Sequence, residues 1–377
     1  MMKVYDRESP DVTTVSAAGL DRHCITATAS LNSLPEMMGL VADAVSTKDA
    51  GILSQVIFAP PGMAGEGLRG LEAAFGTPEW PVAWLEFPDG DGPGLVCSQT
   101  FAVSGVPVRR LEMDGRIVGS LYESESAEFC LLGSIAPSDT SLSRRAQCRQ
   151  VFERIETALS SVGMTFNQVM RTWFYLDRIL SWYGDFNDVR STFFAGSGIL
   201  HGPHPASTGV GMSNPLGAAI LCSALAVRPK GDDLRLQEVE SPVQCPAPDY
   251  RSSFSRAVEI AAPGCRSLHV SGTASIGRDG FTAHVGDVDR QIELTMDAVR
   301  SLLLSRQMDW PDVNRAVAYF ADLRDLPRLI RCLESRGISG LPLAIARADI
   351  CRDDLLFEME VEAAAGRDFD QTTHETG

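Results

Sequence analysis

The chain has 377 residues and carries 49 acidic against 33 basic side chains, giving a formal net charge of -16. At roughly 150 residues per domain this length predicts two or three domains, and the acidity argues against unaided binding to a nucleic-acid backbone. With 44% hydrophobic and 22% charged residues, the composition is that of a globular protein and excludes a disordered or collagenous chain.

The cysteines and the apolar runs indicate in which cellular compartment the protein is expected. The nine cysteines are odd in number and none belongs to a CxxC pair, which excludes a disulfide framework and a zinc knuckle. The longest apolar run, 217–227, falls short of the ~20 residues that a membrane helix needs, and no signal-like segment opens the chain. We therefore expect a cytoplasmic protein without membrane contact, metal or cofactor.

Composition along the chain predicts five segments. The first fifty residues have mixed polarity without strong periodicity, whereas 51–131 has short strand-like runs between Gly/Pro turns. GEGLRG at 65–70 matches GxGxxG, but Pro60 and Pro61 interrupt the strand-to-helix turn, so a glycine-rich loop is expected. In order, we expect an N-terminal extension (1–50), a first domain (51–230), a polar, Pro-rich linker (231–248), a second domain (249–366) and a tail (367–377).

An internal echo indicates a duplicated domain. Residues 159–175 and 303–319, at a constant offset of 144, share six identical positions, among them Arg171/Arg315 and Tyr175/Tyr319. The pattern predicts, in each copy, a helix, a strand, a second helix and a last strand: 150–162, 171–176, 182–194 and 219–227 in the first, and 291–304, 315–320, 326–333 and 355–363 in the second. Strands alternating with helices on one face favour an α+β class.

The last strand of the second copy carries the most distinctive polar pattern. Glu358, Glu360 and Glu362 share one face of this strand, either as a solvated face or with one glutamate acting as a proton donor in a pocket. The matching strand 219–227 has no acid, so any such chemistry belongs to the second copy. Cys351 lies seven residues before Glu358 and is either a small core residue or, beside an arginine, a nucleophile.

Two further patterns leave alternatives open. Arg171 and Tyr175 share a strand face, and an inward-facing arginine must meet a carboxylate, either of the protein or of a substrate. His201 and His204 flank a Gly-Pro pair that precludes a helix face, so loop histidines are expected instead of a metal site.

The order of helix, GMTF, strand, helix and last strand resembles the reactive-intermediate deaminase (RidA-like) superfamily. Its members bind a carboxylate through an arginine in a P-A-R motif, but the matching segments here, PASTG at 205–209 and LPLAIA at 341–346, contain no arginine. This difference argues against imine deamination.

The closer resemblance is to the chorismatase family, whose members look like two such domains joined in one chain. It is carried by RTWFYLDRILSWYGDFNDVR (171–190), SPVQCPAPDYRSSFSRA (241–257), VSGTASIGRDG (270–280) and ICRDDLLFEME (350–360). The resemblance implies two tandem RidA-like (chorismate-mutase-like) domains, each a mixed sheet with helices on one face. It also implies a small-molecule partner, chorismate, and a monomer or small homo-oligomer.

The resemblance further implies roles for individual residues. Glu358 takes the place of the catalytic glutamate, and Gly264 with Cys351 resembles the 3-hydroxybenzoate-forming members, in which the cysteine assists aromatisation. Six residues are expected to bind substrate: Gly264 itself, Arg331, Ser271, Arg171, Tyr175 and Tyr183. The expected activity is conversion of chorismate to 3-hydroxybenzoate and pyruvate; the alternatives are a hydrolytic member that forms a diol, or a non-catalytic binding relative.

Overall fold

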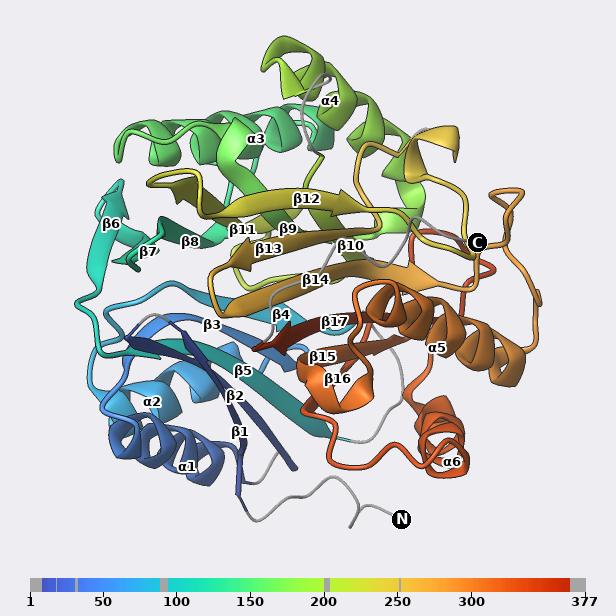
Figure 1. The fold of residues 1–377 in the computed structure, drawn as a ribbon, viewed down its shortest axis with the longest axis horizontal. Coiled ribbons are helices and arrows are strands. Elements are labelled where there is room, and N and C mark those ends of the chain that lie inside the picture. Colours follow the sequence, from blue (N-terminus) through green and yellow to red (C-terminus); the bar gives the residue numbers. More distant parts are fainter. Residues whose placement is uncertain are drawn as a thin grey trace.

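In the computed structural model, which describes residues 9–17, 19–30, 33–88, 94–199, 204–250 and 252–366, the chain folds into three mixed sheets with helices on their outer sides (Figure 1). The expected α+β class is confirmed. None of the helices in these ranges is both long and apolar enough to cross a membrane.

The first sheet has the strand order β1-β2-β5-β3-β4. Its elements are β1 (Asp11–Ala17), β2 (Leu20–Ser30), α1 (Leu34–Thr47), β3 (Gly51–Ala59), α2 (Ala64–Phe75), β4 (Val82–Glu86) and β5 (Leu95–Ser104). The structure thus divides the chain differently from the expected boundaries, because the supposed extension 1–50 supplies two strands and a helix of this sheet. Helix α1 buries Leu34, Met37, Met38, Val41 and Val45 at helical spacing, a pattern that was present in the sequence.

The GxGxxG segment is not a loop but part of α2. Its middle glycine, Gly67, lies against the ring of Trp84, where a Cβ would sit 1.9 Å from a ring carbon. The glycines at this place therefore serve close packing of helix on sheet and not phosphate binding.

The second sheet has the order β10-β9-β11-β8-β7-β6 and the third β12-β13-β14-β17-β15-β16. The second unit comprises β6 (Arg109–Met113), β7 (Arg116–Glu123), β8 (Ala127–Ile135), α3 (Arg144–Ser160), η3 (Phe166–Gln168), β9 (Val169–Leu176), η4 (Ile179–Ser181), α4 (Tyr183–Gly196), β10 (Ala206–Gly211) and β11 (Ile220–Pro229). The third comprises β12 (Arg235–Val239), η6 (Ala247–Tyr250), β13 (Ala257–Ala262), β14 (Cys265–Ala274), α5 (Val288–Leu304), η7 (Trp310–Asp312), β15 (Val313–Phe320), η8 (Leu323–Asp325), α6 (Leu326–Ser335), β16 (Leu343–Arg347) and β17 (Phe357–Ala365).

The three units share one topology. Each has a parallel pair between its third and fourth core strands (β3·β4, β9·β10 and β15·β16), and each has its last strand inserted antiparallel in the middle of the sheet. The same register shift, at Ile52/Ser54, Val169/Arg171 and Val313/Arg315, fixes the correspondence residue by residue. The chain therefore contains three copies of one unit, where the echo had indicated two.

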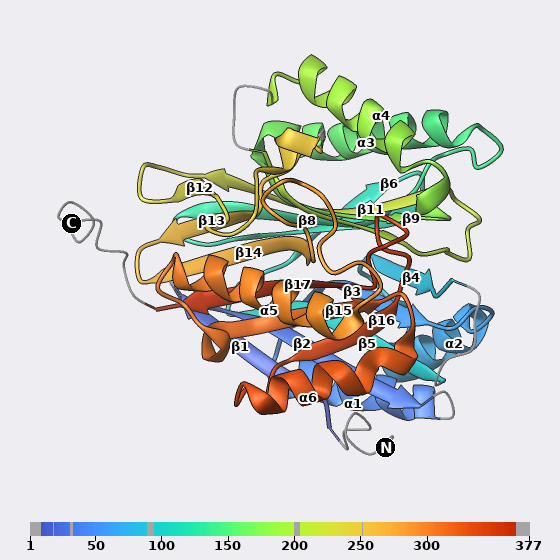
Figure 2. The same ribbon diagram turned by 90° about the vertical axis from the view of Figure 1, so that its right-hand side faces the viewer.

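The copies close into a ring. The edge strand β4 of the first unit lies against β8 of the second, β10 of the second against β14 of the third, and β16 of the third against β2 and β5 of the first (Figure 2). At the centre, three equivalent rings meet: Phe58 lies 6.4 Å from Tyr175 and 6.1 Å from Tyr319, both edge-on. The inner sheet faces thus form a shared core, and three equivalent junctions lie around it.

Candidate active site

The candidate site is a cavity of about 190 Å³ at the junction of the second and third units, where β10 lies beside β14. Backbone contacts fix this junction: the Ser207 amide donates to Ser271 Oγ (2.8 Å), and Ala206 and Ser255 form a parallel bridge. The lining residues come from both units: Tyr183, Asn187, Arg190, Ser207 and Gly209 from the second, and Ser252, Phe254, Arg256, Gly272, Ala274, Ile276, Cys351, Arg352 and Glu358 from the third.

Glu358 on β17 is the one acid among these lining residues, and it is only 4% exposed. Its carboxyl group lies directly over the Gly272 backbone, so close that a Cβ on Gly272 would sit 2.0 Å from Glu358 Oε1. Burial raises the pKa of Glu358 to about 8, and the negative charge of Glu360 adds to the effect, while Arg171 and Arg256 oppose it. A carboxylic acid that keeps its proton at neutral pH can act as a general acid.

Three arginines line the cavity around this acid: Arg190, Arg256 and Arg352. Arg190 and Arg256 are 2% and 3% exposed and lie on the ring of Phe254, each with its guanidinium carbon 5.7 Å from the ring centroid. Arg256 also donates to the Cys245 carbonyl through Nε (3.0 Å) and Nη2 (2.8 Å). The cavity is thus strongly cationic in a chain whose net charge is -16, and it suits an anionic ligand.

Cys351 and Tyr183 form a second functional pair at the cavity. The Cys351 thiol is hydrogen-bonded to the Tyr183 hydroxyl, which in turn contacts Ser252. Burial and the neighbouring Glu358 raise the pKa of Cys351 to about 12, against the lowering effect of Arg352. The thiol is therefore neutral at physiological pH.

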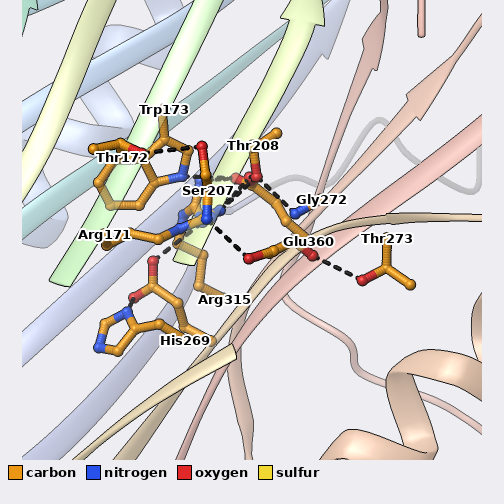
Figure 3. A network of polar contacts seen from close by, with 12 residues as sticks. Arg171, Thr172, Trp173, Ser207, Thr208, His269, Gly272, Thr273, Arg315 and Glu360 are labelled. Carbon is orange, nitrogen blue, oxygen red and sulfur yellow. Dashed lines mark hydrogen bonds and ion pairs between the residues drawn. The ribbon is translucent and has the colours of Figure 1, made fainter. Parts of the chain in front are cut away.

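A fully buried ionic cluster is centred on Glu360, two residues after Glu358 on β17 (Figure 3 shows the cluster). Glu360 Oε2 accepts from Arg171 Nη2 (2.6 Å) and from the Thr208 hydroxyl, and Oε1 accepts from Arg315 Nη2 (2.6 Å) and from Trp173 Nε1 (3.1 Å). Both carboxylate oxygens are therefore fully used, and the cluster joins β9 and β10 of the second unit to β15 and β17 of the third.

The structure brings three of the predicted residues together and separates the others. Glu358, Cys351 and Tyr183 line the cavity. Ser271 lies next to it, fully buried, where its hydroxyl donates to the Ser255 carbonyl (2.6 Å) and accepts from the Ser207 amide. Its place is therefore that of a residue that joins the two units.

Four predicted substrate-binding residues lie elsewhere. Arg171 meets the protein carboxylate of Glu360, one of the two alternatives left open, and Tyr175 is buried at the ring of aromatic side chains in the core. Arg331 is 62% exposed on the outer face of α6, beside Asp289, and Gly264 lies in the β13–β14 turn with φ +72°. Neither is among the residues that line the cavity.

Other cavity residues escaped prediction from the sequence. Arg190, Arg256 and Arg352 all lie inside the segments that carried the family resemblance, but nothing in their spacing shows that three distant arginines converge. Gly209 also lines the cavity. It belongs to the PASTG segment, which was considered only for its lack of an arginine and not for the space that a glycine leaves. Of the two loop histidines, His201 lies outside the described residues, and His204 lies against Phe194.

The other two units carry apolar residues at the positions that correspond to Glu358 and Gly209. By register, Glu358 corresponds to Leu221 and Cys97, both buried, in the other two units. Gly209 corresponds to Ile345 and Trp84, which are also buried. The cavity thus occurs at the junction whose two corresponding positions hold a glycine and an acid.

Comparison with known proteins finds curated relatives of similar sequence. No protein-family model matches the chain. A curated chorismatase from Streptomyces rapamycinicus is 29% identical over 236 residues, which cover 56% of this chain and 67% of that protein. A chorismatase from Streptomyces hygroscopicus is 30% identical over 213 residues, which cover 50% of this chain and 60% of that protein.

The fold has a solved counterpart. A crystal structure of a chorismatase superposes with a TM-score of 0.64 at 19% identity, covering 94% of this chain and 100% of that one. The two proteins therefore share their overall fold, including the first unit that the sequence did not reveal.

Proposed function

Because this chain belongs to the chorismatase family, we propose that it converts chorismate to 3-hydroxybenzoate and pyruvate in the cavity between β10 and β14. The observation that carries the proposal is a carboxyl group that holds its proton near neutral pH, facing a cavity lined by three guanidinium groups. Chorismate is an enol ether with two carboxylates, so its cleavage requires a proton donor and cations to bind the anionic groups.

Glu358 is the proposed acid. It donates its proton to the methylene carbon of the enolpyruvyl group, and the double-bond electrons form the new C–H bond and leave an oxocarbenium ion. The carboxylate that remains is stabilised by Arg256, which already acts on this group in the free protein. General acid catalysis of this kind contributes about 10²- to 10⁴-fold to the rate.

Cys351 is proposed to direct the fate of the intermediate. The ring hydroxyl of the substrate adds to the oxocarbenium carbon and forms a cyclic ketal. The thiol then attacks the ring carbon that bears this oxygen, the C–S bond forms as that C–O bond breaks, and a hemiketal on the neighbouring ring carbon remains. The hydroxyl gives its proton to the Glu358 carboxylate, which has just given its own proton away, and the neutral thiol of Cys351 gives its proton to the departing oxygen as it attacks. The hemiketal then releases pyruvate and leaves a hydroxyl on the ring. Loss of the ring proton beside this hydroxyl together with the sulfur on the next carbon gives 3-hydroxybenzoate and returns the thiol, so the two products together contain the atoms of chorismate.

The test of the acid is incubation with chorismate and measurement of pyruvate release. Glu358→Gln is expected to lower kcat by at least about 100-fold, whereas Glu334→Gln, an exposed glutamate on α6, leaves it unchanged. Full turnover by Glu358→Gln would sink the assignment of the acid. No pyruvate from the unaltered protein would reject the reaction itself and favour a ligand-binding relative.

The product distinguishes the two subtypes. Cys351→Ala is expected to release pyruvate with a dihydroxycyclohexadiene carboxylate in place of 3-hydroxybenzoate, because water then traps the cation. Chromatography of the ring products measures the ratio. If the ratio is the same with and without the thiol, Cys351 has no part in aromatisation.

A further inference from the structure

A hydrogen-bonded path leads from the buried cluster to the floor of the cavity. The Thr208 hydroxyl donates to Glu360, accepts from Arg171 Nη2 (2.6 Å) and accepts from the Gly272 amide (2.9 Å). Gly272 is the residue on which the Glu358 carboxyl lies. Thr208 therefore holds the peptide that supports Glu358, and Glu360 with Arg171 holds Thr208.

The cluster also acts on Glu358 through charge. Glu360 is two residues away on the same strand face, about 7 Å at the usual rise of a strand, and its charge is the second cause of the raised pKa of Glu358. Charged or titratable groups face Glu358 from every element around it: Glu360 on β17, Arg171 on β9, Arg256 before β13, Arg190 and Tyr183 on α4, and Cys351 and Arg352 in the loop before β17.

We propose that Glu360 is a positioning residue for Glu358, acting through the Thr208–Gly272 hydrogen bonds and through its own negative charge. Arg171 and Arg315 balance that charge and keep it in the interior, where an unpaired carboxylate would be expensive. The two glutamates thus differ in role: Glu360 is held by the buried arginines, and Glu358 faces the cavity. The catalytic role of this arrangement rests on the proposed function. The effect of Glu360 on the protonation of Glu358 does not, because it can be measured without substrate.

The charge arm of the test uses Glu360→Gln. The protonation of Glu358 is followed by NMR titration of protein labelled with ¹³C at glutamate carboxyl carbons, and the Glu358 signal is assigned by its loss in Glu358→Gln. Removing the charge of Glu360 is expected to lower the titration midpoint of Glu358 by about one pH unit or more, the size given by two charges roughly 7 Å apart at an effective dielectric constant of about 20. An unchanged midpoint in a folded variant would overturn the electrostatic role.

The positional arm uses uncharged substitutions of Thr208. Thr208→Val keeps the shape but removes the hydroxyl, so kcat for pyruvate release is expected to fall at least tenfold with little change in KM, and the Glu358 midpoint stays within a few tenths of a pH unit. Thr208→Ser restores the hydroxyl and should restore kcat. Wild-type kcat in Thr208→Val would overturn the positional role.

The two arms keep this inference separate from the proposed function. If the unaltered protein does not act on chorismate, the NMR titration still decides whether Glu360 acts on Glu358, and a crystal structure of Thr208→Val shows whether Gly272 and the Glu358 carboxyl move. If Glu360→Gln does not fold because Arg171 and Arg315 are left without their partner, the Thr208 pair and its crystal structure decide, since neither substitution changes a charge.

Discussion

Gly272→Ala tests how closely the position of the acid is controlled. The added Cβ would lie 2.0 Å from Glu358 Oε1, 3.0 Å from its Cδ and 3.1 Å from Thr208 Cγ2. Since ordinary contacts begin near 3.4 Å, the carboxyl oxygen must move by about 1.4 Å, or the β14 backbone must shift. Overpacking of this kind costs about 1–3 kcal/mol of stability, and a displacement of about 1 Å at a reacting group can lower the rate about 100-fold.

The assay combines pyruvate release with thermal unfolding. We expect kcat to fall about 100-fold while the protein remains folded, because Glu358 has the cavity into which to move. Gly209→Ala is the matched control: a Cβ there meets nothing within 4 Å, so its kcat should stay within about twofold. A Gly272→Ala protein that is folded, has the parent kcat and shows an unmoved Glu358 would refute the steric reasoning.

Two other predictions follow from the same site. If Glu358 must be protonated, kcat should be level below and fall above about pH 8, because a raised pKa keeps the acid form up to that pH; a rate that rises through pH 8 would contradict the acid role. Gly209→Ile copies the residue found at the equivalent position, Ile345, and should lower kcat/KM at least about 100-fold with an unchanged thermal midpoint; near-normal kinetics would show that the substrate does not occupy this part of the cavity.

Much of the architecture could be predicted from the sequence because two units kept their polar strand residues. Arg171 and Arg315 both bind the buried Glu360, and this pair is one of the six identities of the echo. In the first unit the equivalent residue is Ser54, and Phe58 replaces the two tyrosines. Ser54 and Phe58 do not match the arginines and tyrosines of the other two units. The first unit therefore shares their topology but not the identities that made the echo visible in the sequence.

Part of the candidate site could also be predicted from the sequence. Glu358 stands out as an acid on a strand with apolar alternate positions, and its neighbour Cys351 lies close in sequence. Arg331 was a poor candidate because the sequence of α6 does not say which of its polar positions faces the core, and the structure places it at 62% exposure. Arg190 and Arg256 meet across a junction of two units, and sequence spacing contains no information about such a junction.

The covalent joining of the three units has a consequence for how the cavity is assembled. The cavity is lined by second-unit residues such as Arg190 and by third-unit residues such as Glu358, all within one chain. The effective concentration of one unit at the other is therefore set by the covalent link between them and not by the protein concentration. Dilution should leave the cavity complete. Joining also lets each unit differ at one position: Gly209 lines the cavity, whereas the corresponding residues Ile345 and Trp84 are large and buried. Identical subunits, which share one sequence, cannot differ in this way.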